Sequence, residues 1–216
     1  PLIVGAGRTD SGVHASNFIA HFESYDIDIE KIHYKLNRFL PHDIVIHQIK
    51  NIEDDFHARY SVVDRTYRYI ILNQTHPSTY FLTTALHYSD KINISKIKSS
   101  FKYLRGKKDY SSFQSSGCSA KSPIKHIKSI KIVKHNNFIY IDITANSFLY
   151  HMVRNIIGAL LDVGSLKKNP DFIHELIEAH DRKKCGKMVS PSGLYLMSIS
   201  YPKKYNIPNS NLSNII

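Results

Sequence analysis

Residues 7–15 read Gly7-Arg8-Thr9-Asp10-Ser11-Gly12-Val13-His14-Ala15, and we interpret the other segments by their relation to this stretch. An apolar run, Leu2-Ile3-Val4, and the small residues Gly5-Ala6-Gly7 precede Asp10, which predicts a short buried strand that enters a tight turn. Arg8 lies two positions before Asp10. On extended backbone both side chains would leave the same face, where the guanidinium can keep the carboxylate ionised. An ionised carboxylate suits a nucleophile rather than a general acid.

Two other interpretations apply to a stretch of this composition. Asp followed by Ser-Gly also occurs in turns without any chemical role, because Asp bonds local amides and Gly accepts positive φ, and composition alone leaves this interpretation open. A phosphate-binding loop is excluded, since Asp10 stands where the dinucleotide motif needs its third Gly. In addition, no Gly-Lys-Ser or Gly-Lys-Thr follows.

The overall composition predicts a globular protein with a polyanionic partner. A chain of 216 residues with 42% hydrophobic content can bury a sizeable core, as one large domain or two half-sized ones. Its formal net charge is +11, and Lys and Arg side chains gain free energy by displacing counterions from phosphates. Lys outnumbers Arg, which favours diffuse attraction to an RNA backbone over bidentate reading of bases. A merely basic protein without such a partner is the alternative.

Metal, disulfide and membrane patterns are lacking in the sequence. Cys118 and Cys185 stand far apart without any Cys-x-x-Cys pair, and none of the 13 His residues belongs to a His-Glu-x-x-His motif. No apolar run approaches the roughly 18 residues of a membrane-spanning helix. We therefore expect no metal site, no membrane segment and a reducing, cytosol-like compartment.

Hydrophobic periodicity and turn residues predict alternating strands and helices. The expected strands are 2–4, 15–22, 43–49, 65–72, 127–133, 138–145 and 194–199, and the expected helices are about 28–40, 94–104, 149–161 and 170–177. The N-caps expected are Asp28 for the first helix, Asn93 or Ser89-Asp90 for the second, and Asn146 or Ser147 for the third. The order of elements predicts two halves, 1–80 and 81–202, followed by a polar tail, 203–216.

The strand predicted at 65–72 combines aromatic and cationic side chains. Strand alternation places Arg65, Tyr67, Tyr69 and Ile71 on one face. A base extruded from RNA could stack on Tyr67, a contact worth about 1–3 kcal/mol, while Arg side chains hold phosphates. Ordinary cross-strand packing of the two Tyr rings is the alternative that composition leaves open.

Five blocks of the sequence resemble, in the same order, motifs of the tRNA pseudouridine synthase A family. They are residues 7–15, 36–44 (Leu-Asn-Arg-Phe-Leu-Pro-His-Asp-Ile), 56–59 with 65–69 (Phe-His-Ala-Arg and Arg-Thr-Tyr-Arg-Tyr), 146–158 (Asn-Ser-Phe-Leu-Tyr-His-Met-Val-Arg-Asn-Ile-Ile-Gly) and 191–196 (Pro-Ser-Gly-Leu-Tyr-Leu). The sequence departs from the family at Lys108 and Tyr110, where the family usually has His and Phe. The resemblance implies an α+β fold of two ferredoxin-like halves with a joined, mostly antiparallel sheet. Helices would cover one face of that sheet, and a basic RNA-binding cleft would lie on the other.

The resemblance also implies roles for individual residues. Asp10 would be the nucleophile, and Arg8 and Arg154 would orient and neutralise its carboxylate. Tyr67 and Leu194 would enclose the uracil, and Arg65 would bind the substrate RNA. The implied reaction is conversion of uridine to pseudouridine at positions 38, 39 and 40 of the tRNA anticodon stem-loop, without cofactor or metal. Homodimers in a bacterial cytoplasm are expected, with an organelle as the alternative location.

The sequence leaves two alternative functions open. A non-catalytic RNA-binding module on the same fold would account for the basic charge, but not for Arg8, Asp10, Tyr67 and Arg154 occurring together. A pseudouridine synthase acting on another RNA is the second alternative. Because the family carries a strand and a helix before the block at 7–15, we expect this chain to be an N-terminally truncated form.

Overall fold

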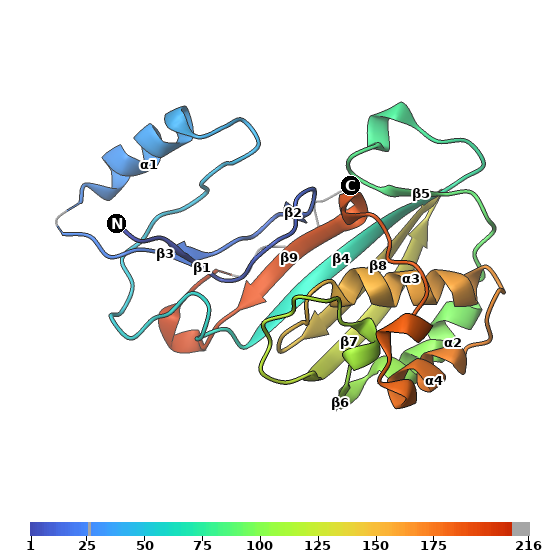
Figure 1. The fold of residues 1–216 in the computed structure, drawn as a ribbon. Helices are drawn as coiled ribbons and strands as arrows, with labels where there is room; N and C mark the ends of the chain where they lie inside the picture. The colour runs from blue at the N-terminus through green and yellow to red at the C-terminus, as the bar shows by residue number, and fades with distance from the viewer. Residues whose placement is uncertain (26, 209–216) are drawn as a thin grey trace.

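The structure is a computed structural model, which describes residues 1–25 and 27–208; residues 209–216 of the predicted tail lie outside the described part. Its elements combine helices and antiparallel strands, so the α+β class is confirmed (Figure 1). The strands are β1 (Val4–Gly5), β2 (His14–Ala15), β3 (Ala20–His21), β4 (Asp64–Asn73), β5 (Leu86–Tyr88), β6 (Gly106–Asp109), β7 (Ile124–His135), β8 (Phe138–Ala145) and β9 (Leu194–Ser200). The α-helices of the described residues are α1 (Ile29–Phe39), α2 (Ile94–Leu104), α3 (Met152–Gly164) and α4 (Phe172–Ala179).

Strand β4 is the centre of a seven-stranded sheet with the order β2-β9-β4-β8-β7-β6, and β5 also pairs with β4. β4 is antiparallel to β8, from Arg65 opposite Ala145 to Leu72 opposite Phe138, and antiparallel to β9 on its other edge. The pairs β2 with β9 and β4 with β5 are parallel. The sheet is therefore mixed and mostly antiparallel.

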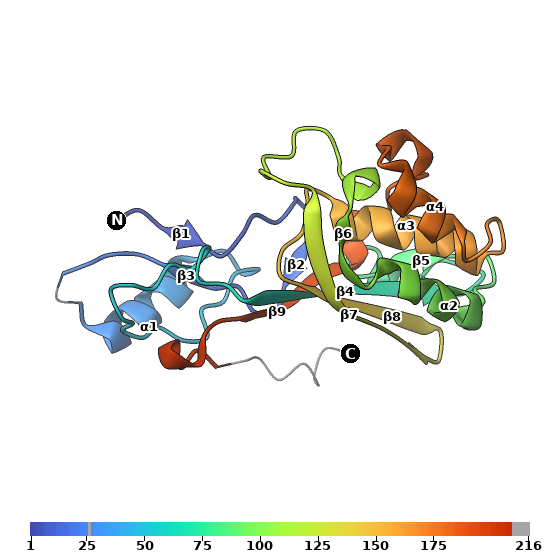
Figure 2. The ribbon, with the colours of Figure 1, turned by 90° about the horizontal axis from the view of Figure 1, so that it is seen from below.

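Helices α2, α3 and α4 cover one side of this sheet, as Figure 2 shows. Alternate residues of β8, Ile139, Ile141 and Ile143, are fully buried and join the same core cluster as Ile156 and Leu160 of α3. Burying each such side chain contributes roughly 1.5–3 kcal/mol, so α3 is held mainly by its apolar contacts. The opposite side of the sheet is polar at its centre, where Arg68 and Asp142 form an ion pair across β4 and β8.

The segment that carries β1, β3 and α1 lies beside the sheet rather than under α2–α4 (Figures 1 and 2). The predicted N-cap is confirmed, since the Asp28 side chain accepts a hydrogen bond from the Lys31 backbone N–H at 3.0 Å. No side chain of α1 is fully buried: Ile32 and Leu36 are half-buried, and Phe39 is 85% exposed. The predicted apolar face therefore exists in α1, but within the described residues it is only partly covered.

Three local predictions were wrong. Residues 43–49 form no strand, and Ile44 and Val45 are exposed. The Asn37 side chain of α1 bonds the backbone N–H and C=O of Ile46, which a neighbouring strand would have bonded in a sheet. The strand expected at 15–22 is split into the two short strands β2 and β3. Helix α3 is capped neither by Asn146 nor by Ser147, because its N-cap residue is His151.

Glycine 158 lets α3 approach the segment before β9. A Cβ atom at this position would lie 2.3 Å from the backbone oxygen of Lys187, which is too close for any side chain. That segment also supplies the carbonyl of Val189, which accepts a hydrogen bond from the Arg154 side chain at 2.9 Å. The close approach at Gly158 therefore fixes the distance between α3 and a backbone group that orients Arg154.

We expect Gly158→Ala to lower the free energy of unfolding by about 1–3 kcal/mol, because the added methyl group must displace backbone. Ala favours helices over Gly by about 1 kcal/mol, so a change governed by helix propensity would instead stabilise the protein. Chemical denaturation measures the difference. Gly7→Ala is the control, since a Cβ there meets nothing within 4 Å. A stabilised Gly158→Ala variant would contradict the close packing.

Candidate active site

The turn that carries Asp10 is fixed against the start of β9. The Val13 backbone N–H bonds the Asp10 carbonyl at 3.1 Å, and Gly12 between them has a φ of 81°, a left-handed value that Gly adopts without strain. A Cβ atom on Gly12 would lie 3.2 Å from the Pro191 ring, which immediately precedes β9 in the chain. β2 then pairs with β9, with His14 opposite Tyr195. Gly12 and the strand that follows it are thus held against the segment 191–195.

The carboxylate of Asp10 is paired with the guanidinium of Arg154. Arg154 Nη1 donates to Asp10 Oδ2 at 3.0 Å, and Arg154 Nε donates to the Val189 carbonyl at 2.9 Å. The Arg154 side chain is 9% exposed and that of Asp10 is 26% exposed. A nearly buried cation therefore faces a carboxylate that solvent, and hence a substrate, can reach.

The contact predicted between Arg8 and Asp10 is not found. Arg8 is exposed, and among the described residues no ion pair joins it to Asp10. The prediction assumed that strand alternation continues through residues 8–10, but β1 ends at Gly5 and the chain has already turned. Of the two Arg residues expected beside Asp10, the structure brings only Arg154 into contact.

His151 is a second neighbour of Asp10, and the sequence analysis assigned it no role. Its Nε2 lies 3.1 Å from Asp10 Oδ2, the oxygen that Arg154 also contacts, and its ring stacks on Tyr150 with centroids 3.6 Å apart. Burial lowers the pKa of His151; Asp10 opposes this shift, and Arg154 and Arg182 add to it. Its position three residues before Arg154 in the block 146–158 was the available signal. Its left-handed backbone, with a φ of 61°, was not predictable from the pattern.

Tyr67 and Leu194 come from the neighbouring strands β4 and β9. In their register Tyr67 lies opposite Leu196, and Leu194 lies opposite Tyr69. Tyr67 is half-buried, and its ring meets Phe148 edge-on at 5.1 Å. Burial raises the pKa of Tyr67, Arg65 opposes this shift and the charge of Asp10 adds to it, so the phenol near the carboxylate stays protonated at neutral pH. Leu194 is 6% exposed and belongs to the main core cluster, against which Tyr67 also packs.

The guanidinium of Arg65 bonds backbone carbonyls. Its Nη2 donates to Ala6 at 2.7 Å, and its Nη1 donates to Asn146 at 3.2 Å. Burial lowers the pKa of Arg65, the expected effect of removing a cation from water. Arg65 therefore ties the strand entering the Asp10 turn to the end of β8, which is a different geometry from an exposed phosphate-binding group.

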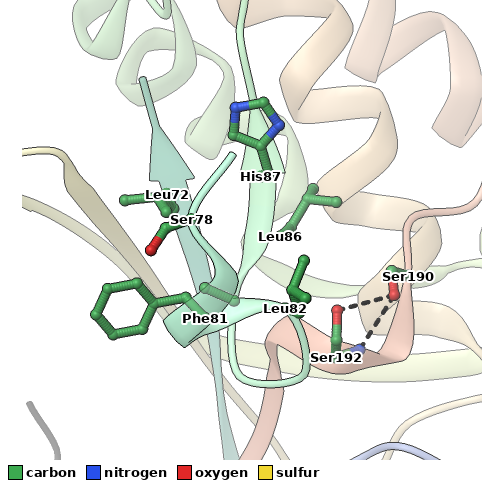
Figure 3. Close-up of a pocket in the computed structure, with 9 residues that line it drawn as sticks. Leu72, Ser78, Phe81, Leu82, Leu86, His87, Ser190 and Ser192 are labelled. Carbon is green, nitrogen blue, oxygen red and sulfur yellow. Dashed lines mark hydrogen bonds between the residues drawn. The ribbon is translucent and has the colours of Figure 1, made fainter. Parts of the chain in front are cut away.

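The Asp10 site lies at the N-terminal end of α3. Arg154 belongs to α3 itself, so the helix layer contributes a residue to this site. A separate hollow of about 240 Å³ adjoins the same segment before β9 (Figure 3). It is lined by Leu72, Ser78, Phe81, Leu82, Ala85, Leu86, His87, Ser190 and Ser192. The hydroxyls of Ser190 and Ser192 are hydrogen-bonded to each other at 2.9 Å, and no Asp, Glu, Lys or Arg side chain contributes to the lining.

Within 1–25 and 27–208, no group of three or more His, Cys, Asp or Glu side chains could hold a metal ion. No helix in that part of the chain has the length and apolar character needed to cross a bilayer.

Known proteins resemble this chain over nearly its whole length. A family model described as tRNA pseudouridine synthase matches residues 101–202. A protein of Buchnera aphidicola subsp. Acyrthosiphon pisum (strain APS), named tRNA pseudouridine synthase A, is 39% identical over 99% of this chain and 80% of its own length. Proteins of the same name from Coxiella burnetii (strain Dugway 5J108-111) and Aliivibrio salmonicida (strain LFI1238) are 41% and 36% identical. They match 98% and 95% of this chain, and 81% and 79% of their own lengths.

The chain belongs to the tRNA pseudouridine synthase A family. The resemblance that five short motifs indicated is therefore confirmed over both halves of the sequence. In this member of the family, Asp10, His151 and Arg154 are in contact, Tyr67 and Leu194 lie in adjacent strands, and Arg8 stands apart.

A double-mutant cycle on the free energy of unfolding can test which Arg is coupled to Asp10. We expect Arg154→Gln and Asp10→Asn to show a coupling energy of about 1–3 kcal/mol. Either single substitution already removes the charge-assisted hydrogen bond, so the double variant does not lose it a second time. The matched cycle of Arg8→Gln with Asp10→Asn should give a coupling below about 0.5 kcal/mol. Equal coupling in the two cycles would contradict the observed pairing.

Proposed function

We propose that this protein is a tRNA pseudouridine synthase that converts uridine to pseudouridine at positions 38, 39 and 40 of the tRNA anticodon stem-loop. The observation that carries the proposal is the pairing of Asp10 with Arg154 at 3.0 Å, in a chain that belongs to the tRNA pseudouridine synthase A family. The relatives' names specify tRNA, and the choice of the anticodon stem-loop rests on the motif resemblance.

The reaction is an isomerisation, so its atoms balance without a co-reactant. The bond between N1 of the base and C1′ of the ribose breaks, the uracil turns, and a bond forms between C5 and C1′. The proton on C5 is lost and N1 gains one. The enzyme must supply a nucleophile, retain the detached base and hold the nucleotide out of the RNA stack. Attack of Asp10 on C6 of the base and attack on C1′ both satisfy this balance.

The proposed roles follow from the positions of the side chains. Asp10 acts as the nucleophile, since it is partly exposed and its negative charge is balanced by the Arg154 guanidinium. Tyr67 stacks on the uracil, and Leu194 forms the apolar wall beside it. Arg65 positions the Asp10 turn through its bond to the Ala6 carbonyl. Arg8 is exposed beside the turn, where its charge is available to an RNA phosphate.

The basic surface supports RNA as the substrate. The chain carries 29 Lys and Arg against 18 Asp and Glu residues, and Lys187 is exposed two positions before Val189, whose carbonyl bonds Arg154. A Lys at this place can contact a phosphate of an RNA whose nucleotide enters the site. The homodimer implied by the family resemblance and a location in the bacterial cytoplasm are part of the same proposal.

Asp10→Asn should abolish pseudouridine formation and leave tRNA binding within about threefold, since one charge among many contacts is lost and the nucleophile is removed. The measurement is release of tritium from tRNA labelled at C5 of uridine, beside a filter-binding assay. Asp90→Asn is the control, because Asp90 is an exposed acid paired with Lys167.

The same assay separates the alternatives. An unmodified protein that binds tRNA but releases no tritium would be a non-catalytic RNA-binding module. Tritium released only from a different RNA would indicate another substrate. An active Asp10→Asn variant would overturn the assignment of the nucleophile.

Lys187→Gln should weaken tRNA binding equally for different tRNA sequences. It should also reduce the magnitude of the slope of log K, the binding constant, against log salt concentration by about 1, because the variant makes one phosphate contact fewer and binding then releases fewer counterions. Binding is measured at several salt concentrations. Lys98→Gln in α2 is the matched control, an exposed Lys outside the segments that contact Asp10 or Arg154. If both variants change the slope alike, the contact surface is not centred on the Asp10 site.

A further inference from the structure

The two oxygens of the Asp10 carboxylate have different surroundings. Oδ2 receives both contacts, from Arg154 Nη1 at 3.0 Å and from His151 Nε2 at 3.1 Å. Oδ1 accepts no hydrogen bond from any described residue. The carboxylate is thus held through one oxygen on the side of α3, and the other oxygen is left for a substrate.

The buried environment of His151 selects one tautomer. Its Nδ1 is buried and has no hydrogen-bond partner within the described residues. A proton on Nδ1 would be a buried donor without an acceptor, which costs more than a bare ring nitrogen in the same place. The neutral ring therefore carries its proton on Nε2, the nitrogen that faces Asp10.

The charges around the ring also keep it neutral. Arg154 on the same helix and Arg182 disfavour a second proton, and the carboxylate of Asp10 favours one. Burial, the largest effect, lowers the pKa of His151 from its ordinary value of 6.5. At pH 7 His151 is thus a neutral donor rather than a second cation.

The backbone of His151 is held in an unusual conformation. It is the N-cap of α3 with a φ of 61° and a ψ of 8°, a left-handed geometry that costs a non-Gly residue about 1–3 kcal/mol unless its surroundings favour it. This conformation and the stacked Tyr150 ring together place Nε2 beside Oδ2. Strain of this kind occurs where a side chain must be aimed.

We propose that His151 is a positioning residue for the proposed reaction: its neutral Nε2–H and the Arg154 guanidinium both hold Oδ2 of Asp10, so that Oδ1 is presented to the uridine. The proposal rests on the proposed function of Asp10 and deepens it. It assigns the attacking atom, Oδ1, and gives a role to a residue that bonds no substrate atom.

Two substitutions separate the donor from the backbone. In His151→Asn the side chain tolerates left-handed φ, but its amide reaches only the place of Nδ1; in His151→Gln the amide nitrogen reaches the place of Nε2. We expect His151→Asn to lower kcat by about 10- to 100-fold with KM nearly unchanged, because the orienting contact of Nε2 with the Asp10 carboxylate is lost. His151→Gln should recover kcat to within about fivefold of the unmodified protein.

His174→Asn is the matched control, since His174 also stacks on a Tyr ring, Tyr103, and lies near a carboxylate, Glu178, but in α4. It should leave kcat unchanged. A kcat within twofold of normal in His151→Asn, or equal losses in the Asn and Gln variants, would overturn the proposal.

The tautomer provides a test that needs no enzymatic activity. Nitrogen-15 NMR of imidazole-labelled protein at pH 7 should show His151 neutral with its proton on Nε2, and Asp10→Asn should shift the Nε2 resonance. An imidazolium, or a proton on Nδ1, would overturn the proposal even if the protein is active. Conversely, absence of pseudouridine formation by the unmodified protein with the expected tautomer would refute the proposed function and leave the His151 contact established.

Discussion

The ion pair between Asp10 and Arg154 joins two parts of the chain that are 144 residues apart. As a whole residue, Arg154 is 8% exposed. An unpaired guanidinium at that depth would lower the stability of the fold by several kcal/mol, so its position requires the carboxylate and the Val189 carbonyl. Three segments therefore meet at the Arg154 guanidinium: the turn after β1 with Asp10, the first turn of α3 with Arg154 itself, and the segment before β9 with the Val189 carbonyl. The candidate active site is also a junction of the fold.

The remaining site residues depend on the sheet. β4 pairs with β8 on one edge and with β9 on the other, and this places Tyr67 and Leu194 on neighbouring strands although they are 127 positions apart in the sequence. Since one-residue slippage of a strand would reverse the direction of every side chain, the buried residues Ile139, Ile141 and Ile143 of β8 also fix the face of Tyr67. Core packing and the positions of the two residues proposed to enclose the uracil are thus set by the same register.

Local features were predictable where the cause is local. Asp28 and Asn93 cap α1 and α2 as expected, each accepting a bond from a backbone N–H three residues on, and the strands at 65–72, 138–145 and 194–199 were found with small changes at their ends. The strand predicted for the β-branched run at 43–49 is absent because a strand needs a neighbouring strand to pair with, and β propensity does not show whether one is present. The predicted contact between Arg8 and Asp10 was wrong because strand alternation was assumed to continue past the end of β1, where the chain already turns.

The candidate site was partly predictable for the same reason. The motifs marked Asp10, Tyr67, Arg154 and Leu194, but which groups touch is decided by tertiary structure, and the left-handed conformation of His151 follows from no pattern in the sequence. That conformation has a chemical consequence. A carboxylate bonded through both oxygens would be stabilised as an anion and would lose nucleophilicity. Contacts concentrated on Oδ2 let Arg154 balance the charge while Oδ1 stays unbonded by the described residues. In the proposed reaction, stabilisation and reactivity therefore reside on different atoms of one side chain.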